Sequence, residues 1–174
     1  GQADKFKQAI RRSGYYTRYI ERNLSKEGIP VELAVLPFVE SSFNVRAHSH
    51  VGAAGIWKFM PATGRRFMKV NHVIDERYDP YRATDAAVKF LKYNYSILKS
   101  WPLALTAYNH GVGGMRRAIR KTGTTDIGVI VEKYRSRTFG FASRNFYSEF
   151  LAALAVSRYA VRYFPGVQPH APQD

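Results

Sequence analysis

One nearly apolar segment, residues 30–41 (PVELAVLPFVES), constrains the fold of this 174-residue chain more than any other feature. A helix that is hydrophobic on almost all sides has to be buried, so other segments must pack around it. Pro37 lacks the N–H that would bond to the carbonyl of Leu33, which predicts a kink. The segment therefore predicts a buried, kinked helix.

The rest of the chain alternates between helical patterns and turns that Gly or Pro mark. Residues 43–55 carry turn chemistry without a helical period, which predicts an ordered loop with a short β excursion. Residues 71–82 also look irregular. Apolar spacings of three and four predict helices over residues 3–24 with a break near Gly14, 61–68, 84–98 capped by Thr84, 102–110, 114–120, 126–134 capped by Thr125, and 143–163. The fold class expected from this pattern is mainly α.

No repeat, low-complexity tract or linker divides the chain, so we expect one structural domain overall. Within it, residues 1–27 are expected to form an N-terminal helical extension that packs on a core domain of residues 28–164. Residues 165–174 are expected to form a flexible tail. The longest apolar run, Phe150–Val156, is far shorter than the ~18–20 residues of a membrane-spanning helix, so no transmembrane segment is expected.

The formal net charge of +14 favours a polyanionic partner, such as nucleic acid, an anionic membrane face or a cell-wall polymer. The chain has no cysteine, which excludes a disulfide framework and a thiolate metal site. Its first residues lack the apolar stretch of a signal peptide, but a chain numbered from Gly1 leaves the compartment open.

Glu40 is the one acid at the end of the apolar segment. On a helix it shares a face with Leu33 and Leu36 and lies at the negative end of the helix dipole. Burial and the dipole both disfavour the charged form, so we expect a raised pKa, as a proton donor for glycosidic bond cleavage requires. The burial pattern by itself favours a structural glutamate that caps the next loop or pairs with Arg46.

Residues 32–64 (ELAVLPFVESSFNVRAHSHVGAAGIWKFMPATG) resemble the catalytic core of the soluble lytic transglycosylase family, glycoside hydrolase family 23. Within it they are most similar to the membrane-bound D type. The family's three motifs appear in order as Glu40-Ser41, Gly55–Lys58 and Ala107–Asn109. The resemblance extends from about residue 28 to residue 153. It implies a lysozyme-like fold of the goose type, with residues 28–164 as the catalytic domain.

The resemblance implies that Glu40 protonates the bond between N-acetylmuramic acid and N-acetylglucosamine in peptidoglycan. Glu40 then acts as a base on the muramoyl 6-hydroxyl, which closes a 1,6-anhydro ring. The substrate-binding residues that the resemblance implies, or that replace family residues in the groove, are Ser49, Lys58, Met60, Tyr108, Asn109 and Tyr147. No metal and no cofactor are expected.

The motifs place no second acid beside Glu40. Retaining and inverting glycosidases need two carboxylates, so a lone Glu40 leaves the nucleophile to the substrate. Four acids lie in or near a different irregular segment, and any one of them at the site would weaken this expectation: Asp75, Glu76, Asp79 and Asp85.

Two positions depart from the family pattern. Lys58 stands where the family has glutamine, and it can only donate hydrogen bonds. It either points away from Glu40 or signals altered substrate contacts or reduced activity. The late Glu-Thr-x-x-Tyr motif is replaced by residues 142–146 (ASRNF), so Asn145 or Tyr147 is expected to substitute.

Other candidate residues are assigned to structure. Trp57 and Trp101 are expected in the core rather than against sugar rings. His48 and His50 lack metal-ligand spacing, and His110 is expected at the groove or on the surface. Residues 116–121 (RRAIRK) predict a solvated helix face, with Met115 and Ile119 facing inward.

The expected partner is the peptidoglycan glycan strand rather than nucleic acid. The protein is expected to be a monomer in the periplasm or cell envelope, or secreted, with peripheral association to the envelope. Three other functions remain open: hydrolysis of the same bond by water, as in goose-type lysozyme; a peptidoglycan-binding module weakened by Lys58; and a nucleic-acid binder.

Overall fold

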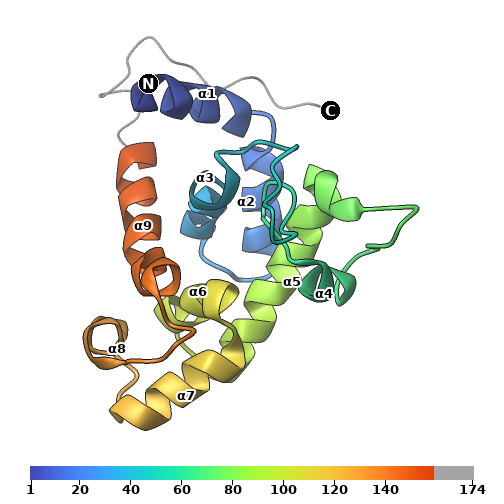
Figure 1. The fold of residues 1–174 in the computed structure, drawn as a ribbon. Helices are drawn as coiled ribbons and strands as arrows, with labels where there is room; N and C mark the ends of the chain where they lie inside the picture. Colours follow the sequence, from blue (N-terminus) through green and yellow to red (C-terminus); the bar gives the residue numbers. More distant parts are fainter. Residues whose placement is uncertain (159–174) are drawn as a thin grey trace. The chain divides into compact units, whose positions relative to one another are not determined.

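The structure, a computed structural model, describes residues 1–158 and is mainly helical, as predicted (Figure 1). Its α-helices are α1 (Gln2–Ser13), α2 (Thr17–Lys26), α3 (Leu36–Ser41), α4 (Pro61–Arg65), α5 (Pro80–Leu98), α6 (Trp101–His110), α7 (Val112–Thr122), α8 (Ile127–Lys133) and α9 (Phe141–Arg158). Two 3-10 turns complete the set: η1 (Val31–Val35) and η2 (Glu76–Tyr78). None of the helices within residues 1–158 is long and apolar enough to cross a membrane.

The chain divides into two compact units. Of the described residues, the first unit comprises 1–89 and 152–158, and the second comprises 90–151. Helices α5 and α9 contribute residues to both units. The expected boundaries at residues 27 and 164 stay a prediction, and the expected tail lies outside the described residues.

In the first unit, the N-terminal helical pattern breaks near Gly14 as predicted, which gives α1 and α2. Ile20 and Leu24 of α2 are fully buried. Gly28 adopts a φ of +70°, in the left-handed region that favours glycine, and ends this helical stretch. The chain can therefore turn at Gly28 into the apolar segment.

The apolar segment forms two elements rather than one kinked helix. Residues 31–35 make the 3-10 turn η1, and α3 begins at Leu36. Pro37 lies in the first turn of α3, where a missing N–H breaks no helical bond, so the break precedes the proline. Because η1 is not α-helical, Leu36 shares an α-helical face with Glu40 and Leu33 does not. The predicted burial of the apolar segment is confirmed, since the side chains of Leu33 and Leu36 are 2% and 0% exposed.

The loop after α3 contains the predicted β excursion. Ala54 forms isolated antiparallel bridges with His48 and with Phe59. Helix α4 then ends at Arg65, three residues before the predicted end.

Helix α5 begins at Pro80 rather than at Thr84. The Asp79 carboxylate accepts hydrogen bonds from the amides of Tyr81 and Arg82 and so fills the position predicted for Thr84. The Thr84 hydroxyl instead donates to the carbonyl of Pro80.

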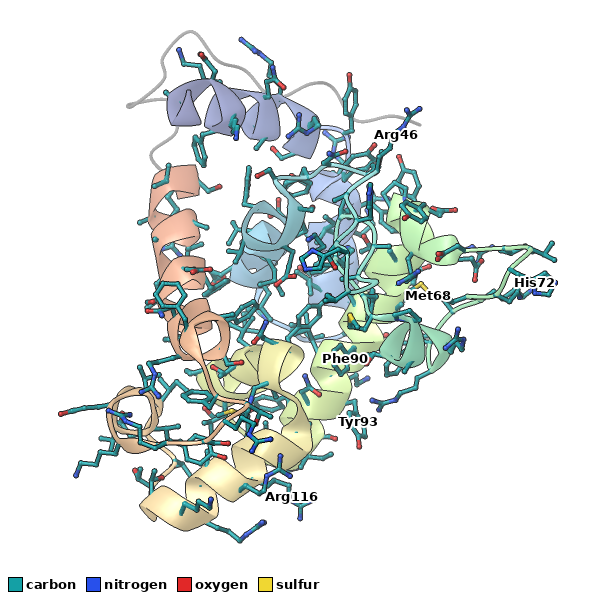
Figure 2. The ribbon with its side chains drawn as sticks, in the orientation of Figure 1. Arg46, Met68, His72, Phe90, Tyr93 and Arg116 are labelled. Carbon is teal, nitrogen blue, oxygen red and sulfur yellow. The ribbon has the colours of Figure 1, made fainter. Side chains whose placement is uncertain are left out.

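The second unit packs helices α6, α7 and α8 around one core. Asp126, not Thr125, caps α8 by accepting the amide of Val129. The basic run on α7 is a solvated face as predicted, and Figure 2 shows Arg116 projecting from it. The buried side chains of this core are Leu98, Leu103, Ala107, Met115, Ala118, Ile130, Tyr134 and Phe139.

Candidate active site

Glu40 is the last residue but one of α3 and is half-buried. It lines an open pocket of about 360 Å³ in the first unit. Figure 2 shows Arg46, another lining residue, on the loop that follows α3. The pocket is lined by Glu40, Ser41, Asn44, Arg46, Ala47, His48 and Lys58. Glu40 is the only carboxylate among them.

Ser41 joins α3 to the Gly55–Lys58 motif. Its hydroxyl donates to the carbonyl oxygen of Ile56 at 2.7 Å and also lies 3.2 Å from the carbonyl oxygen of Pro37. The first bond spans 15 residues of sequence. The serine of the Glu-Ser motif therefore fixes Glu40 relative to the second motif.

The Gly55–Lys58 motif is a tight turn packed against η2. Gly55 has a φ of +82°, and a Cβ at this position would lie 1.8 Å from the carbonyl oxygen of Arg77, so only glycine fits. Trp57 is fully buried, and its indole N–H donates to the Thr84 hydroxyl at 3.0 Å. The prediction that Trp57 belongs to the core is confirmed.

Lys58 lines the same pocket as Glu40. Its φ of +53° is in the left-handed region, where a residue with a Cβ is strained by about 1–3 kcal/mol. Arg46 lines this pocket too, and the alternative in which Glu40 pairs with Arg46 stays a prediction. Lys58 therefore lies at the pocket, and the expectation of altered substrate contacts or reduced activity stays a prediction.

The four acids of the irregular segment have other partners, and none lines the pocket of Glu40. All four lie in the first unit, as Glu40 does. Asp75 pairs with Arg77, Glu76 accepts from the amide of Lys69 and lies 3.7 Å from Arg82, Asp79 caps α5, and Asp85 accepts from the hydroxyl of Tyr19.

Arg77, which the sequence analysis did not single out, holds the loop that carries the second motif. Its Nη1 donates to the carbonyl oxygens of Gly52 and Phe59 at 2.6 and 2.8 Å. Its Nε and Nη2 donate to the two carboxylate oxygens of Asp75 at 2.9 and 2.8 Å. These hydrogen bonds hold the pKa of Asp75 below its usual value of 3.8. The spacing Asp75-x-Arg77 was the only sequence signal of this cluster.

Ser49 and Met60 lie in the first unit but outside the lining of the Glu40 pocket. The Ser49 hydroxyl accepts the amide of Ala53 at 3.1 Å and so supports the turn before Gly55. Met60 is 43% exposed at the start of α4. Their substrate contacts stay a prediction.

Tyr108, Asn109 and Tyr147 belong to the second unit. The ring of Tyr108 lies 5.2 Å from that of Phe90, and the Oδ1 of Asn109 accepts the hydroxyl of Ser143 at 2.7 Å. Ser143 stands at the threonine position of the late family motif and keeps its hydroxyl. Tyr147 stacks on Phe150 at 6.1 Å, and its role in substrate binding stays a prediction.

His110 belongs to the packing of the second unit, which corrects the expectation of a groove or surface residue. Its ring packs edge-on against Phe139 at 5.0 Å and Tyr134 at 6.2 Å. A Cβ on Gly114 would lie 2.5 Å from this ring. Burial, with a smaller effect from the positive charge of Arg117, lowers the pKa of His110 below 6.5. Within residues 1–158, no group of three or more His, Cys, Asp or Glu side chains forms a metal site.

Residues 18–131 match the family model of the transglycosylase SLT domain. The chain is 37% identical over 106 residues to a protein of Alteromonas sp. (strain M-1) named "Putative tributyltin chloride resistance protein". It is 37% identical over 107 residues to membrane-bound lytic murein transglycosylase D of Escherichia coli (strain K12). Each match covers 60% of this chain, but only 51% of the first relative and 24% of the second.

Two solved structures have a similar fold. One is the 70-kDa soluble lytic transglycosylase of Escherichia coli, with a TM-score of 0.68 and 24% identity over 88% of this chain and 25% of that one. The other is an inactive Glu→Gln mutant of the lytic transglycosylase Slt from Pseudomonas aeruginosa, with a TM-score of 0.66 and 22% identity over the same shares. These likenesses confirm the predicted lysozyme-like fold.

Proposed function

Because this chain belongs to the transglycosylase SLT domain family, we propose that it is the catalytic domain of a lytic murein transglycosylase. Its substrate would be the β-1,4 bond between N-acetylmuramic acid and N-acetylglucosamine in peptidoglycan. One observation carries the proposal: Glu40 is the only carboxylate that lines its pocket, and the Ser41 hydroxyl ties its helix to the second family motif.

In the first step the protonated Glu40 donates its proton to the glycosidic oxygen. The bond from the muramoyl C1 to this oxygen breaks, and N-acetylglucosamine leaves with a free 4-hydroxyl. In the second step the muramoyl 6-hydroxyl attacks C1, and its proton passes to the Glu40 carboxylate. The product is a 1,6-anhydro sugar, Glu40 is protonated again, and no water is consumed.

The single carboxylate supports this sequence of steps. Retaining glycosidases place two carboxyl groups about 5–5.5 Å apart, and inverting ones about 6.5–9.5 Å apart. With one carboxylate in the pocket, we expect the substrate to supply the nucleophile. The inactive Glu→Gln mutant of the Pseudomonas aeruginosa relative is in keeping with chemistry that depends on one glutamate.

We assign six residues to substrate binding. Hydroxyl, amide and ammonium groups would hydrogen-bond the sugar rings and their N-acetyl groups, and Met60 would offer an apolar contact. The net charge of +14 would favour an anionic cell envelope over a neutral surface, and we expect a monomer. The six residues are Ser49, Lys58, Met60, Tyr108, Asn109 and Tyr147.

The proposal is tested by digesting purified sacculi in H₂¹⁸O and analysing the muropeptides by mass spectrometry. We expect anhydro ends without ¹⁸O, because no water enters the product. Reducing ends that carry ¹⁸O would show instead a muramidase of the goose-type lysozyme class.

Glu40→Gln should lower the rate by about 10²- to 10⁴-fold, which is the usual contribution of general acid–base catalysis. Glu32→Gln is the matched control, because Glu32 lies in η1 outside the Glu40 pocket. Equal loss of activity in both variants would contradict the assignment of Glu40.

A peptidoglycan-binding module is the second candidate, and Lys58 is the observation that favours it. A cation beside a carboxylate favours the charged form, which cannot donate a proton. Lys58→Gln restores the family residue and should then raise activity. Wild-type protein and Glu40→Gln that both bind sacculi, with no activity in either, would support the module over the enzyme.

A further inference from the structure

Helix α1 precedes residue 18, where the family match begins, yet it contacts the element that carries Glu40. The ring of Phe6 stacks on Phe38 of α3, with centroids 5.9 Å apart and an interplanar angle of 28°. Phe38 packs edge-on against Phe43, whose centroid lies 4.7 Å away. Helix α1 is therefore part of the packing around the turn that bears Glu40.

Arg12, the last residue but one of α1, binds a backbone oxygen two residues after Glu40. Its Nε and Nη2 donate to the carbonyl oxygen of Ser42 at 3.1 and 2.8 Å. A guanidinium holds its donors in a planar fork, which a lysine ammonium cannot reproduce. The carbonyl of Ser42 is therefore fixed in both position and direction by α1.

The turn that receives this contact is strained. Ser42 and Phe43 have φ values of +52° and +58°, and neither is glycine. Such conformations persist when surrounding contacts hold them. Helix α3 has only six residues, too few to be stable alone. The geometry of its last turn, including Glu40, thus depends on contacts from other elements.

The two residues that follow Glu40 in sequence are both anchored. The Ser41 hydroxyl binds the carbonyl of Ile56, and the Ser42 carbonyl accepts the guanidinium fork of Arg12. We propose that Arg12 is a positioning residue for Glu40 and that α1 holds the active-site turn in place. This inference rests on the function proposed above.

The test compares Arg12→Met and Arg12→Lys with Arg11→Met on soluble glycan strands. Arg11 is the exposed neighbour in α1, and within residues 1–158 no hydrogen bond or ion pair of its side chain is found. We expect kcat of Arg12→Met to fall by about 10- to 100-fold with little change in KM, as for a misplaced catalytic group. Arg12→Lys should be intermediate, because it keeps the charge without the fork, and Arg11→Met should match the wild type.

Amide hydrogen exchange gives a second readout that does not depend on activity. The amides of Ser42 and Phe43 donate to the carbonyls of Phe38 and Pro37, so their exchange reports the last turn of α3. In Arg12→Met their exchange should accelerate while α2 and α5 stay protected. A general loss of protection would show a purely structural role and overturn the inference.

Glu40→Gln is measured in the same assay to separate the two proposals. If Glu40→Gln is inactive and Arg12→Met equals Arg11→Met in kcat and exchange, the inference about Arg12 is wrong. If Glu40→Gln keeps wild-type activity, the proposed function is wrong, and the role of Arg12 in positioning a catalytic group fails with it.

Discussion

Single residues decide how the pocket of Glu40 is held. Arg77 is 8% exposed and joins the carbonyls of Gly52 and Phe59 to the carboxylate of Asp75. A buried charge is stable only when it is paired and hydrogen-bonded, and here every contact falls on the loop or on η2. These partners compensate the guanidinium for the water it loses on burial. The same hydrogen bonds hold the loop against η2.

Arg77→Met should destabilise the protein by about 3–5 kcal/mol, because it strips the charge partner from Asp75 and leaves two carbonyls without their donor. Arg82→Met is the control, since the Arg82 side chain is 66% exposed and lies 3.7 Å from Glu76. That exposed pair should contribute only about 0–1 kcal/mol. Urea unfolding of both variants measures the difference, and equal midpoints would contradict the role of Arg77.

His110 should make stability depend on pH. Its folded pKa lies below the usual 6.5, so the unfolded chain binds the proton more readily than the folded one. The stabilising effect is complete above pH 6.5 and is lost as the pH falls through 6.5 toward the folded pKa. His110→Gln should flatten the dependence of the urea midpoint between pH 7.5 and 5. A dependence as steep as that of the wild type would show that another group is responsible.

At the scale of elements, α3 is short and is held in place by its neighbours. The Ser41 hydroxyl is its connection to the Gly55–Lys58 turn. Ser41→Ala should leave the Ile56 carbonyl without this donor, which costs about 1–3 kcal/mol, and should lower kcat because Glu40 loses an anchor. Ser42→Ala is the control, since no hydrogen bond of the Ser42 hydroxyl is found within residues 1–158. Similar kcat values in both variants would contradict the link.

The elements predicted well from sequence are those whose ends the sequence marks. Pro102 and Gly111 bracket α6, and both ends lie within a residue of the prediction. The apolar pattern found the buried segment around Leu36, but it cannot separate a 3-10 turn from an α-helix. The cap of α5 was misplaced although Asp79-Pro80, a capping residue followed by proline, was readable.

The site was predictable only in part, for a physical reason. Glu40 stood out because an acid on an apolar stripe is conspicuous, and the family resemblance supplied its role. Arg12 and Arg77 did not stand out, because their main partners are backbone carbonyls, which every residue carries. Lys58 was recognised as a departure, but its place in the pocket needed the fold.

At the scale of the whole molecule, charge is the dominant property. The chain carries 27 Lys and Arg residues against 13 Asp and Glu, and the basic face of α7 is solvated. At about 0.1 M salt the Debye length is about 10 Å, so attraction to an anionic wall should weaken sharply as salt rises.

Binding to sacculi, measured by co-sedimentation of Glu40→Gln, should therefore fall several-fold between low and physiological salt. Replacing Arg116 and Arg120 with Glu should weaken binding and flatten its salt dependence. Replacing them with Met changes the net charge by half as much, so the loss of binding should be smaller. Binding that is indifferent to salt would show that neutral sugar contacts dominate.

The close approach of Gly55 to the Arg77 carbonyl has an evolutionary consequence. A side chain at residue 55 would occupy the space that this backbone oxygen fills. Because every residue carries a backbone oxygen, the glycine should be kept among descendants of one ancestral sequence, whatever side chain stands at position 77. A lineage that replaced only the glycine would have to rebuild the whole 3-10 turn η2, a change that a single substitution cannot make.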